Sequence, residues 1–490
     1  MDDGTVDDYV LNRGEPWIGA AWAALLACLV ASVLTVATPA SAAGLGEEPT
    51  FFIETIAVEG QRRVTPSIIV AESLLEPGQL YRESELRESV YRIQRLPFVL
   101  DAGFALRKGS ERGRYELVIT IEELRRYFFG TDLIVTRFTN SVSFDTIPGG
   151  EWTASLGGLA GIRFFVGNYG VLFGSVSTER GTQLGYTQYN LFGRRAFLSV
   201  GLTSAGCCNN RVFSLGIDPT FSNWNSEGDF RETQVTLGMP LGVDQALRLR
   251  ATHNYSSDGV RSNLLGVDRP RRGLLYEDLL TNELELAWVR DTTDDPIFPR
   301  EGTLQTLAVD IQSVETEFFA PVNFDFFLQD SVILPPGVME GDRLPETRNR
   351  QIRLSGSVEQ TWSLGSRSTV TLSARAAVGQ SQVENLPVVE PSPPGSEAPL
   401  VLRIIEDEDL DLFEAQVAAR YSVSLWGPRK TREKGDLRWE TRFEYAYDRA
   451  FPDLDLEDNP LHRKTVYTSV VYRNSWGVFR FGFQVADYGA

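Results

Sequence analysis

The chain has 490 residues, a formal net charge of −19 and 11% aromatic residues. An acidic surface repels phosphate backbones, and no basic cluster offsets it here, so we exclude nucleic acid as a partner. Two histidines and three cysteines are too few for a zinc site or a Ser/His/Asp triad. We therefore expect neither an enzyme nor a bound cofactor.

The first 42 residues are typical of an export signal. An apolar run at 17–38 is followed by small residues, and Ala40-Ser41-Ala42 suits cleavage by signal peptidase. The segment before this run is atypical, because it holds five acidic residues and one arginine. The run is also long enough to span a bilayer, which leaves an uncleaved membrane anchor as the alternative. We expect a cleaved signal peptide at 1–42.

Residues 51–125 predict a small α+β domain of order β-α-α-β-β. Thr65-Pro66 supplies a helix start, with proline at the first helical position. Apolar residues then recur at helical spacing between 83 and 95 among charged neighbours. The expected elements are strands at 51–60, 98–107 and 115–122 and helices at 66–76 and 83–95.

From residue 126 to 490 the pattern has period two, which is typical of strands. The segment 437–445 (LRWETRFEY) alternates charged with aromatic or aliphatic residues, as in a strand with one lipid face and one watery face. We predict a transmembrane antiparallel β-barrel, because closure satisfies edge hydrogen bonds that hydrocarbon cannot. The length accommodates about sixteen strands of roughly ten residues. A long soluble sandwich or propeller is the alternative.

Four motifs of the small domain resemble those of POTRA domains. They are V-x-G-x-x-R-V-T at 58–65, L-x-P-G-x-x-Y at 75–81, L-P-F-V at 96–99 and L-V-I-T-I-E-E at 117–123. The resemblance implies a periplasmic domain that binds unfolded clients or accessory subunits by adding a strand to an exposed sheet edge. We take Phe98, Val99, Phe104 and Leu106 as candidate partner-binding residues. A generic α+β domain of the same order is the alternative.

Two segments of the predicted barrel carry a second resemblance. Y-N-L-F-G at 189–193 and the turn-rich R-D-T-T-D-D-P-I-F-P-R-E-G at 290–302 resemble the barrel of the outer-membrane protein assembly factor superfamily. This superfamily includes BamA-like and TamA-like proteins and the related two-partner secretion transporters. The resemblance implies an outer-membrane location, with lipids and client proteins as partners.

The sequence also departs from this superfamily. Its members carry a V-R-G-[FY] motif on an inward-folded loop late in the barrel, and this motif does not occur here. The corresponding place is a predicted loop at 385–411, in which Arg403 is the candidate counterpart and an ordinary loop arginine the alternative. The sequence ends in Asp487-Tyr-Gly-Ala490, without the terminal aromatic residue that many barrels use for insertion. Both departures weaken the expectation of full assembly activity.

We expect a BamA-like insertase or translocase. The resemblance implies a weak seam between the first barrel strand, near 132–139, and the last, near 478–485, which opens laterally to template a client. One alternative is a passive porin or solute transporter whose acidic lumen favours cations. Another is a structural surface protein that works through acidic and proline-rich loops at 330–350 and 386–411.

Overall fold

The computed structural model describes residues 48–138, 152–178, 181–206, 213–214, 229–261, 274–318, 332–333, 336–339, 342–390, 400–426, 435–449 and 461–489. By contacts the chain divides into Met1–Glu48 and Pro49–Ala490, and the second unit holds all the described helices and strands. The expected signal peptide at 1–42 lies outside the described residues.

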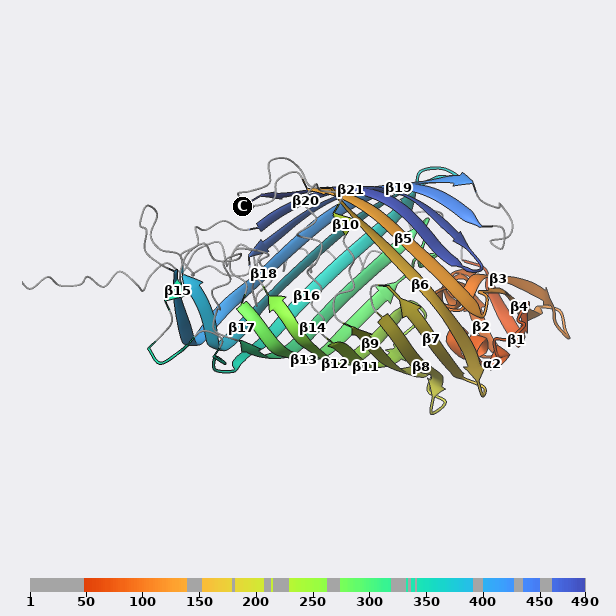
Figure 1. The fold of residues 1–490 in the computed structure, drawn as a ribbon. Coiled ribbons are helices and arrows are strands. Elements are labelled where there is room, and N and C mark those ends of the chain that lie inside the picture. The colour runs from red at the N-terminus through yellow and green to blue at the C-terminus, as the bar shows by residue number, and fades with distance from the viewer. Residues whose placement is uncertain are drawn as a thin grey trace, which may run out of the picture. The chain divides into compact units, whose positions relative to one another are not determined.

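A small α+β domain comes first in the second unit. Its strands are ordered β2-β1-β4-β3, with β1 and β4 parallel and both outer pairs antiparallel. The strand β2 lies between the helices, so it extends the expected order β-α-α-β-β. The elements are β1 (Thr50–Glu59), α2 (Pro66–Ser73), β2 (Gln79–Arg82), α3 (Glu83–Gln94), β3 (Val99–Lys108) and β4 (Arg114–Glu123) (Figure 1). Neither of these helices has the length and apolar character needed to cross a membrane.

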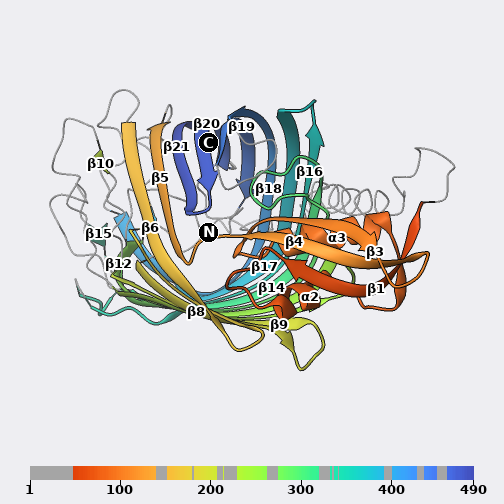
Figure 2. The same ribbon diagram turned by 90° about the vertical axis from the view of Figure 1, so that its right-hand side faces the viewer.

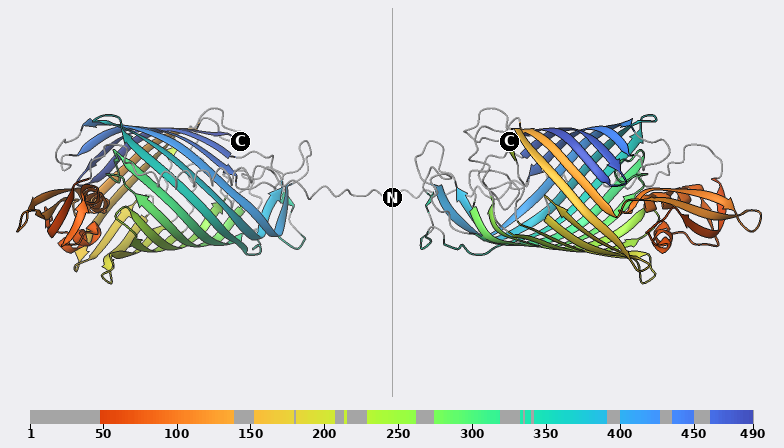
Figure 3. Two further views of the ribbon diagram at one scale, coloured as in Figure 1. Left: turned by 180° about the vertical axis from the view of Figure 1, so that it is seen from behind. Right: turned by 45° about the vertical axis from the view of Figure 1, so that its right-hand side comes forward.

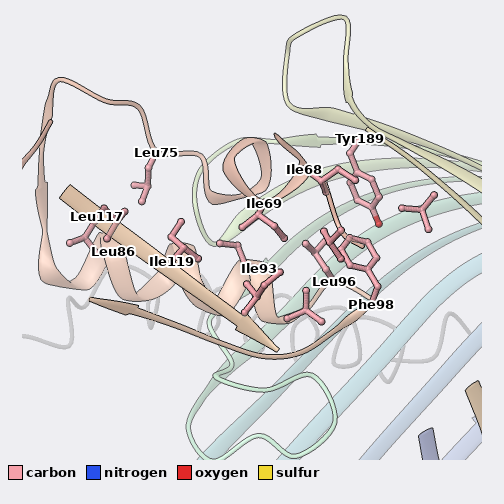
Figure 4. Close-up of a cluster of buried hydrophobic side chains, with 14 of the residues drawn as sticks. Ile68, Ile69, Leu75, Leu86, Ile93, Leu96, Phe98, Leu117, Ile119 and Tyr189 are labelled. Carbon is pink, nitrogen blue, oxygen red and sulfur yellow. The ribbon is translucent and has the colours of Figure 1, made fainter. Parts of the chain in front are cut away.

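One apolar core holds the small domain together (Figure 4). Ile68 of α2 and Ile93 of α3 are fully buried against Leu117 and Ile119 of β4. The helix α2 starts with proline at its first position, as expected, but Thr65 makes no side-chain capping bond. Burial of the helix face against the sheet therefore stabilises α2 more than its cap does.

Glu123, the last residue of β4, fixes the chain that follows β1. Its Oε1 accepts the backbone N–H groups of Arg62, Arg63 and Val64 at 2.7, 2.9 and 2.8 Å. Just before them, Gly60 has a φ of +87°, and a Cβ there would lie 2.3 Å from a β4 carbonyl oxygen. The motif at 58–65 thus combines a glycine for close backbone approach with a turn whose N–H groups face one carboxylate.

The rest of the second unit is one large sheet. Figure 2 looks into it from the end that carries the small domain, and Figure 3 shows the tilt of its strands. Its strands are β5 (Tyr127–Phe138), β6 (Trp152–Val166), β7 (Gly170–Ser177), β8 (Gly181–Leu191), β9 (Ala196–Gly206), β10 (Phe213–Ser214), β11 (Asp229–Pro240), β12 (Gln245–Arg261), β13 (Leu274–Asp291), β14 (Gly302–Phe318), β15 (Val332–Ile333), β16 (Thr347–Ser363), β17 (Ser368–Glu390), β18 (Leu400–Trp426), β19 (Asp436–Arg449), β20 (Leu461–Asn474) and β21 (Gly477–Gly489).

The sheet closes into a barrel of 15 long strands within the described residues. The short β10 and β15 add to its rim, through pairings with β6 and β18. The expected count of about sixteen is corrected, because the long strands have 8 to 27 residues and most exceed the ten that we assumed. With an odd number of strands, the first and last run in the same direction. Accordingly β5 and β21 pair in parallel, and all other neighbouring long strands are antiparallel.

The two faces of the barrel wall differ in polarity. On β14, the exposed Leu307, Val309 and Ile311 alternate with residues of the opposite face such as Asp310. On that opposite face Arg353 of β16 contacts Asp310 at 2.8 Å and Glu414 of β18 at 3.5 Å. Apolar residues face lipid in such barrels and polar ones face the lumen. The described part of the lumen therefore contains paired charges of both signs.

The contacts of Glu123 generate a stability prediction. Glu123→Ala leaves three N–H groups without their acceptor, and we expect a loss of about 1–3 kcal/mol in the free energy of unfolding of the small domain. Hydrogen exchange of the amides of residues 62–64 measures it. Glu111→Ala, at an exposed turn residue, is the control. Unchanged protection at 62–64 in the Glu123 variant contradicts the assigned role.

Candidate functional site

The connection between β13 and β14, residues 292–301, folds as a compact loop that we call the mouth loop. Asp295 Oδ1 accepts the backbone N–H groups of Ile297 and Phe298, both at 2.8 Å. Asp294 Oδ1 accepts the N–H of Arg300 at 2.7 Å. Aspartates commonly bond to backbone two residues ahead in this way, which explains why a D-D-P-x-x-P run specifies a fixed loop.

The mouth loop reaches parts of the ring far from its own strands. Arg438 of β19 lies with its guanidinium carbon 4.4 Å from the ring centroid of Phe298. Arg300 donates to the carbonyl of Ser366, in the β16–β17 turn, at 3.2 Å. Ser363 donates in return to the carbonyl of Arg300 at 2.9 Å. Since β14 and β19 are separated by β16, β17 and β18 in the ring, the loop crosses the barrel opening as a chord.

A buried ion pair joins this loop to β20 and to the small domain. Arg473 Nη1 lies 2.9 Å from both carboxylate oxygens of Asp295, and the two side chains are 5% and 1% exposed. Arg473 also donates from Nη2 to the carbonyl of Leu100 in β3 at 3.2 Å. Gln94 of α3 donates to Asp295 Oδ2 at 3.4 Å. We call these four residues the mouth cluster.

Further polar contacts hold α3 and its flanks against the barrel turns. Arg95, which follows α3, lies 3.1 Å from Asp291 and donates to the carbonyl of Thr293 at 2.8 Å. Arg163 of β6 donates to the carbonyl of Pro97 at 2.7 Å. The small domain and the barrel opening are therefore joined by charge-assisted bonds as well as by apolar packing.

The apolar part of this junction centres on Phe98. Its ring makes edge-to-face contacts with Tyr189 of β8 at a centroid distance of 5.9 Å (Figure 4) and with Phe165 of β6 at 5.3 Å. Such pairs add about 0.5–1.5 kcal/mol to the burial of the rings. The L-P-F-V motif at 96–99 thus lies at the contact between the two parts.

The structure also places the other candidate partner-binding residues. Phe98 and Val99 are 1% and 2% exposed, and Phe104 and Leu106 pack partly buried against the same core. These four side chains are therefore turned into the protein. What β3 offers to a partner is its backbone edge, since in the described residues β3 pairs with β4 alone. Client binding at this edge stays a prediction.

Residues 385–390 and 400–411 are strand and not the loop that we predicted, because β17 continues to Glu390 and β18 begins at Leu400. Arg403 lies in β18, paired with Val388 of β17. Its backbone is thus part of a continuous ladder and not of an inward-folded loop. The proline-rich residues 391–399 of the surface-protein alternative lie outside the described residues.

The predicted neighbours at the seam are adjacent in the structure. Residues 129–138 of β5 pair with 477–486 of β21 without a bulge. Arg480 and Asp132 approach to 3.7 Å across this seam. At the small-domain end, the Arg125 guanidinium lies 4.3 Å from the Trp476 ring centroid. The ladder is longer than those of β6 with β7 and β7 with β8, so its length does not mark it as weak.

Residues 165–390 match the Omp85 superfamily domain. A search of curated protein sequences finds no match. BamA from Haemophilus ducreyi lacking POTRA domains 1–3 aligns at 10% identity over 89% of this chain and 81% of that one, with a TM-score of 0.36. CdiB from Escherichia coli aligns at 13% identity over 89% and 72%, with a TM-score of 0.37. CdiB from Acinetobacter baumannii aligns at 8% identity over 90% and 74%, with a TM-score of 0.36.

The mouth cluster generates the second prediction. Asp295→Ala leaves Arg473 buried without a counter-charge, and we expect it to weaken the contact of small domain and barrel by about 3–5 kcal/mol. Hydrogen exchange of α3 amides in the reconstituted protein measures this contact. Arg87→Ala removes an exposed ion pair of the same helix and serves as control, with an expected loss of about 0.5 kcal/mol or less. Equal effects of both variants contradict the prediction.

Glu88 of α3 generates a pH prediction. Burial raises the pKa of its carboxyl from 4.5 to about 7, opposed by Arg95 and Arg290 and reinforced by Asp244 and Asp291. In the docked domain Glu88 therefore takes up a proton that it lacks when exposed at neutral pH. A raised docked pKa means that docking is strongest at low pH and weakens as the pH rises from about 4.5 to 7.

Hydrogen exchange of α3 at pH 5, 6, 7 and 8, corrected for intrinsic exchange, measures this dependence. Glu88→Gln keeps the shape of the side chain without its charge and should flatten the profile. Glu83→Gln, at an exposed position of the same helix, should give the same pH profile as the unmodified protein. A profile that Glu88→Gln does not alter contradicts the assignment.

Proposed function

We propose, from the match of residues 165–390 to the Omp85 superfamily domain, that the chain inserts or translocates client proteins at the outer membrane. Proteins of this superfamily are assembly and transport barrels. In this proposal residues 126–490 form the outer-membrane barrel, and residues 51–125 form a POTRA-like domain in the periplasm. Outer-membrane lipids surround the barrel, and periplasmic accessory subunits bind the small domain.

The observation that carries the proposal is a strand edge held beside a barrel opening. The small domain is fixed there by the mouth cluster and by Phe98. Near the barrel, the carbonyl of Leu100 is already engaged by Arg473. The distal half of β3, residues 103–108, has no described partner on its outer side. An extended client segment can pair with this backbone edge and so begin its passage beside the barrel.

The passive porin is less well supported by the described residues. A cation-selective lumen needs unpaired acids, whereas described acids such as Glu359 are paired with arginine, here Arg420 at 3.0 Å. The mouth loop also crosses the opening and is tied to β19 and β20. A pore for small solutes has no use for a strand-binding module at its entrance. We therefore keep the porin as the competing outcome of the experiment.

The proposal is tested by site-specific photocrosslinking during client insertion. A photoreactive amino acid replaces Ala105, which is exposed on β3, and a urea-denatured outer-membrane barrel protein is added to the reconstituted chain. We expect crosslinks to the client while it inserts. Thr120 is exposed on the inner strand β4 of the same sheet and is the matched control, because β4 is paired there with both β1 and β3.

Two outcomes would count against the proposal. Equal crosslinking from both positions would mean that the client does not use the β3 edge. Absence of insertion in the vesicles, together with a steady conductance that the client does not alter, would favour the porin. Depletion of the protein in its host then discriminates further, because an insertase deficiency lowers several unrelated β-barrels together.

A further inference from the structure

The turn between β8 and β9 holds its backbone in an unusual conformation. Asn190, Phe192 and Arg195 have φ values of +52°, +52° and +60°, and Gly193 adds +69°. A residue other than glycine at positive φ costs about 1–2 kcal/mol. The turn is nevertheless firmly closed, since Arg195 N donates to Asn190 Oδ1 at 3.0 Å and Gly193 N donates to the Asn190 carbonyl at 3.1 Å. Such strain is retained where a specific side-chain display is needed.

One side of this turn carries the small domain. Tyr189 is 6% exposed and packs on Phe98. Arg195 donates to the carbonyl of Leu74, just after α2, at 2.7 Å and to Glu76 at 2.9 Å. The residues on both sides of the turn are therefore held by the small domain. The tip, residues 192–194, takes no part in these contacts.

The tip displays an aromatic residue beside a cation. Phe192 is 90% exposed, more than any other large hydrophobic residue described, and its neighbour Arg194 is also exposed. No contact within the described chain accounts for Phe192. Tyrosine, tryptophan and phenylalanine beside arginine form the usual pattern at the boundary of a bilayer, where the ring enters the interface and the cation meets phosphate.

Other turns and strand ends at the same end of the barrel support this assignment. Each carries an exposed apolar side chain: Tyr127 at the start of β5 (52%), Leu241 after β11 (54%), Leu364 after β16 (58%) and Trp426 at the end of β18 (62%). Together they mark a ring at the small-domain end. Such rings of large side chains flank the lipid-facing band of membrane barrels. Phe192 continues this ring.

We propose that the β8–β9 turn binds the phospholipid surface at the small-domain end, with Phe192 inserted among the headgroups and Arg194 at their phosphates. The same turn then holds the small domain on its inner side and the bilayer on its outer side. This inference goes beyond client handling, because it concerns the lipid contact that positions the domain. It holds equally for an insertase and for a pore.

The test places a fluorescent label at the tip. Cys28, Cys207 and Cys208 are replaced by serine, and Phe192→Cys carries an environment-sensitive fluorophore. The labelled protein is reconstituted in vesicles of phosphatidylethanolamine and phosphatidylglycerol that contain headgroup-labelled nitroxide lipid. We expect a blue-shifted emission that loses most of its intensity to the nitroxide. Arg112→Cys, in the exposed distal turn of the small domain, is the control and should remain unquenched.

The outcomes separate lipid from protein as the occupant. A label at 192 that is neither shifted nor quenched overturns the proposal. A blue shift without quenching also overturns it, because the tip is then covered by protein. Arg194→Glu should reduce the quenching in vesicles with phosphatidylglycerol and much less in purely zwitterionic vesicles. If Arg194→Glu leaves the quenching unchanged in both kinds of vesicle, Arg194 does not contact lipid phosphate. Client insertion is not part of this readout, so its failure leaves the test intact.

Discussion

An open sheet leaves the backbone groups of its two edge strands unpaired, and the rest of this structure depends on that constraint. The barrel satisfies it by pairing β5 with β21 over residues 129–138 and 477–486. With 15 long strands the ring closes in parallel, which is unusual for bacterial barrels of a single chain. Closure also brings the start of the barrel, which follows the small domain directly, beside the β20–β21 turn. Arg125 and Trp476 meet there.

Polar and apolar contacts have different tasks where the small domain meets the barrel. Phe98, Phe165 and Tyr189 bury rings and supply adhesion without fixing one orientation. The pair of Asp295 and Arg473 is costly to desolvate and adds little net adhesion, but it tolerates few alternative geometries. Together they define one docked arrangement. Glu88 adds a proton-dependent contribution to the same contact.

The sequence predicted those features that repeat or that obey local rules. Strands followed from period two, and the turn-rich connection after β13 was visible in its aspartates and prolines. The strand β2 was missed because four residues show no period. The strand count differed from the expected sixteen because the period-two pattern does not mark how far a strand extends, so the 27-residue length of β18 was not visible. The partner of Asp295 lies 178 residues away, and nothing local marks Arg473.

The mouth loop has a mechanical consequence. A closed ring of strands resists stretching along its inter-strand hydrogen bonds, but its cross-section changes easily from circular to oval. The mouth loop ties β13 and β14 to β19 and β20 across the opening. The curvature of the sector of barrel wall between these strands is therefore fixed at the small-domain end. The arc from β5 to β9 is braced separately by the small domain, which contacts Arg163 of β6, Tyr189 of β8 and Arg195. At this end of the barrel the sector and the small domain should therefore move as one solid piece.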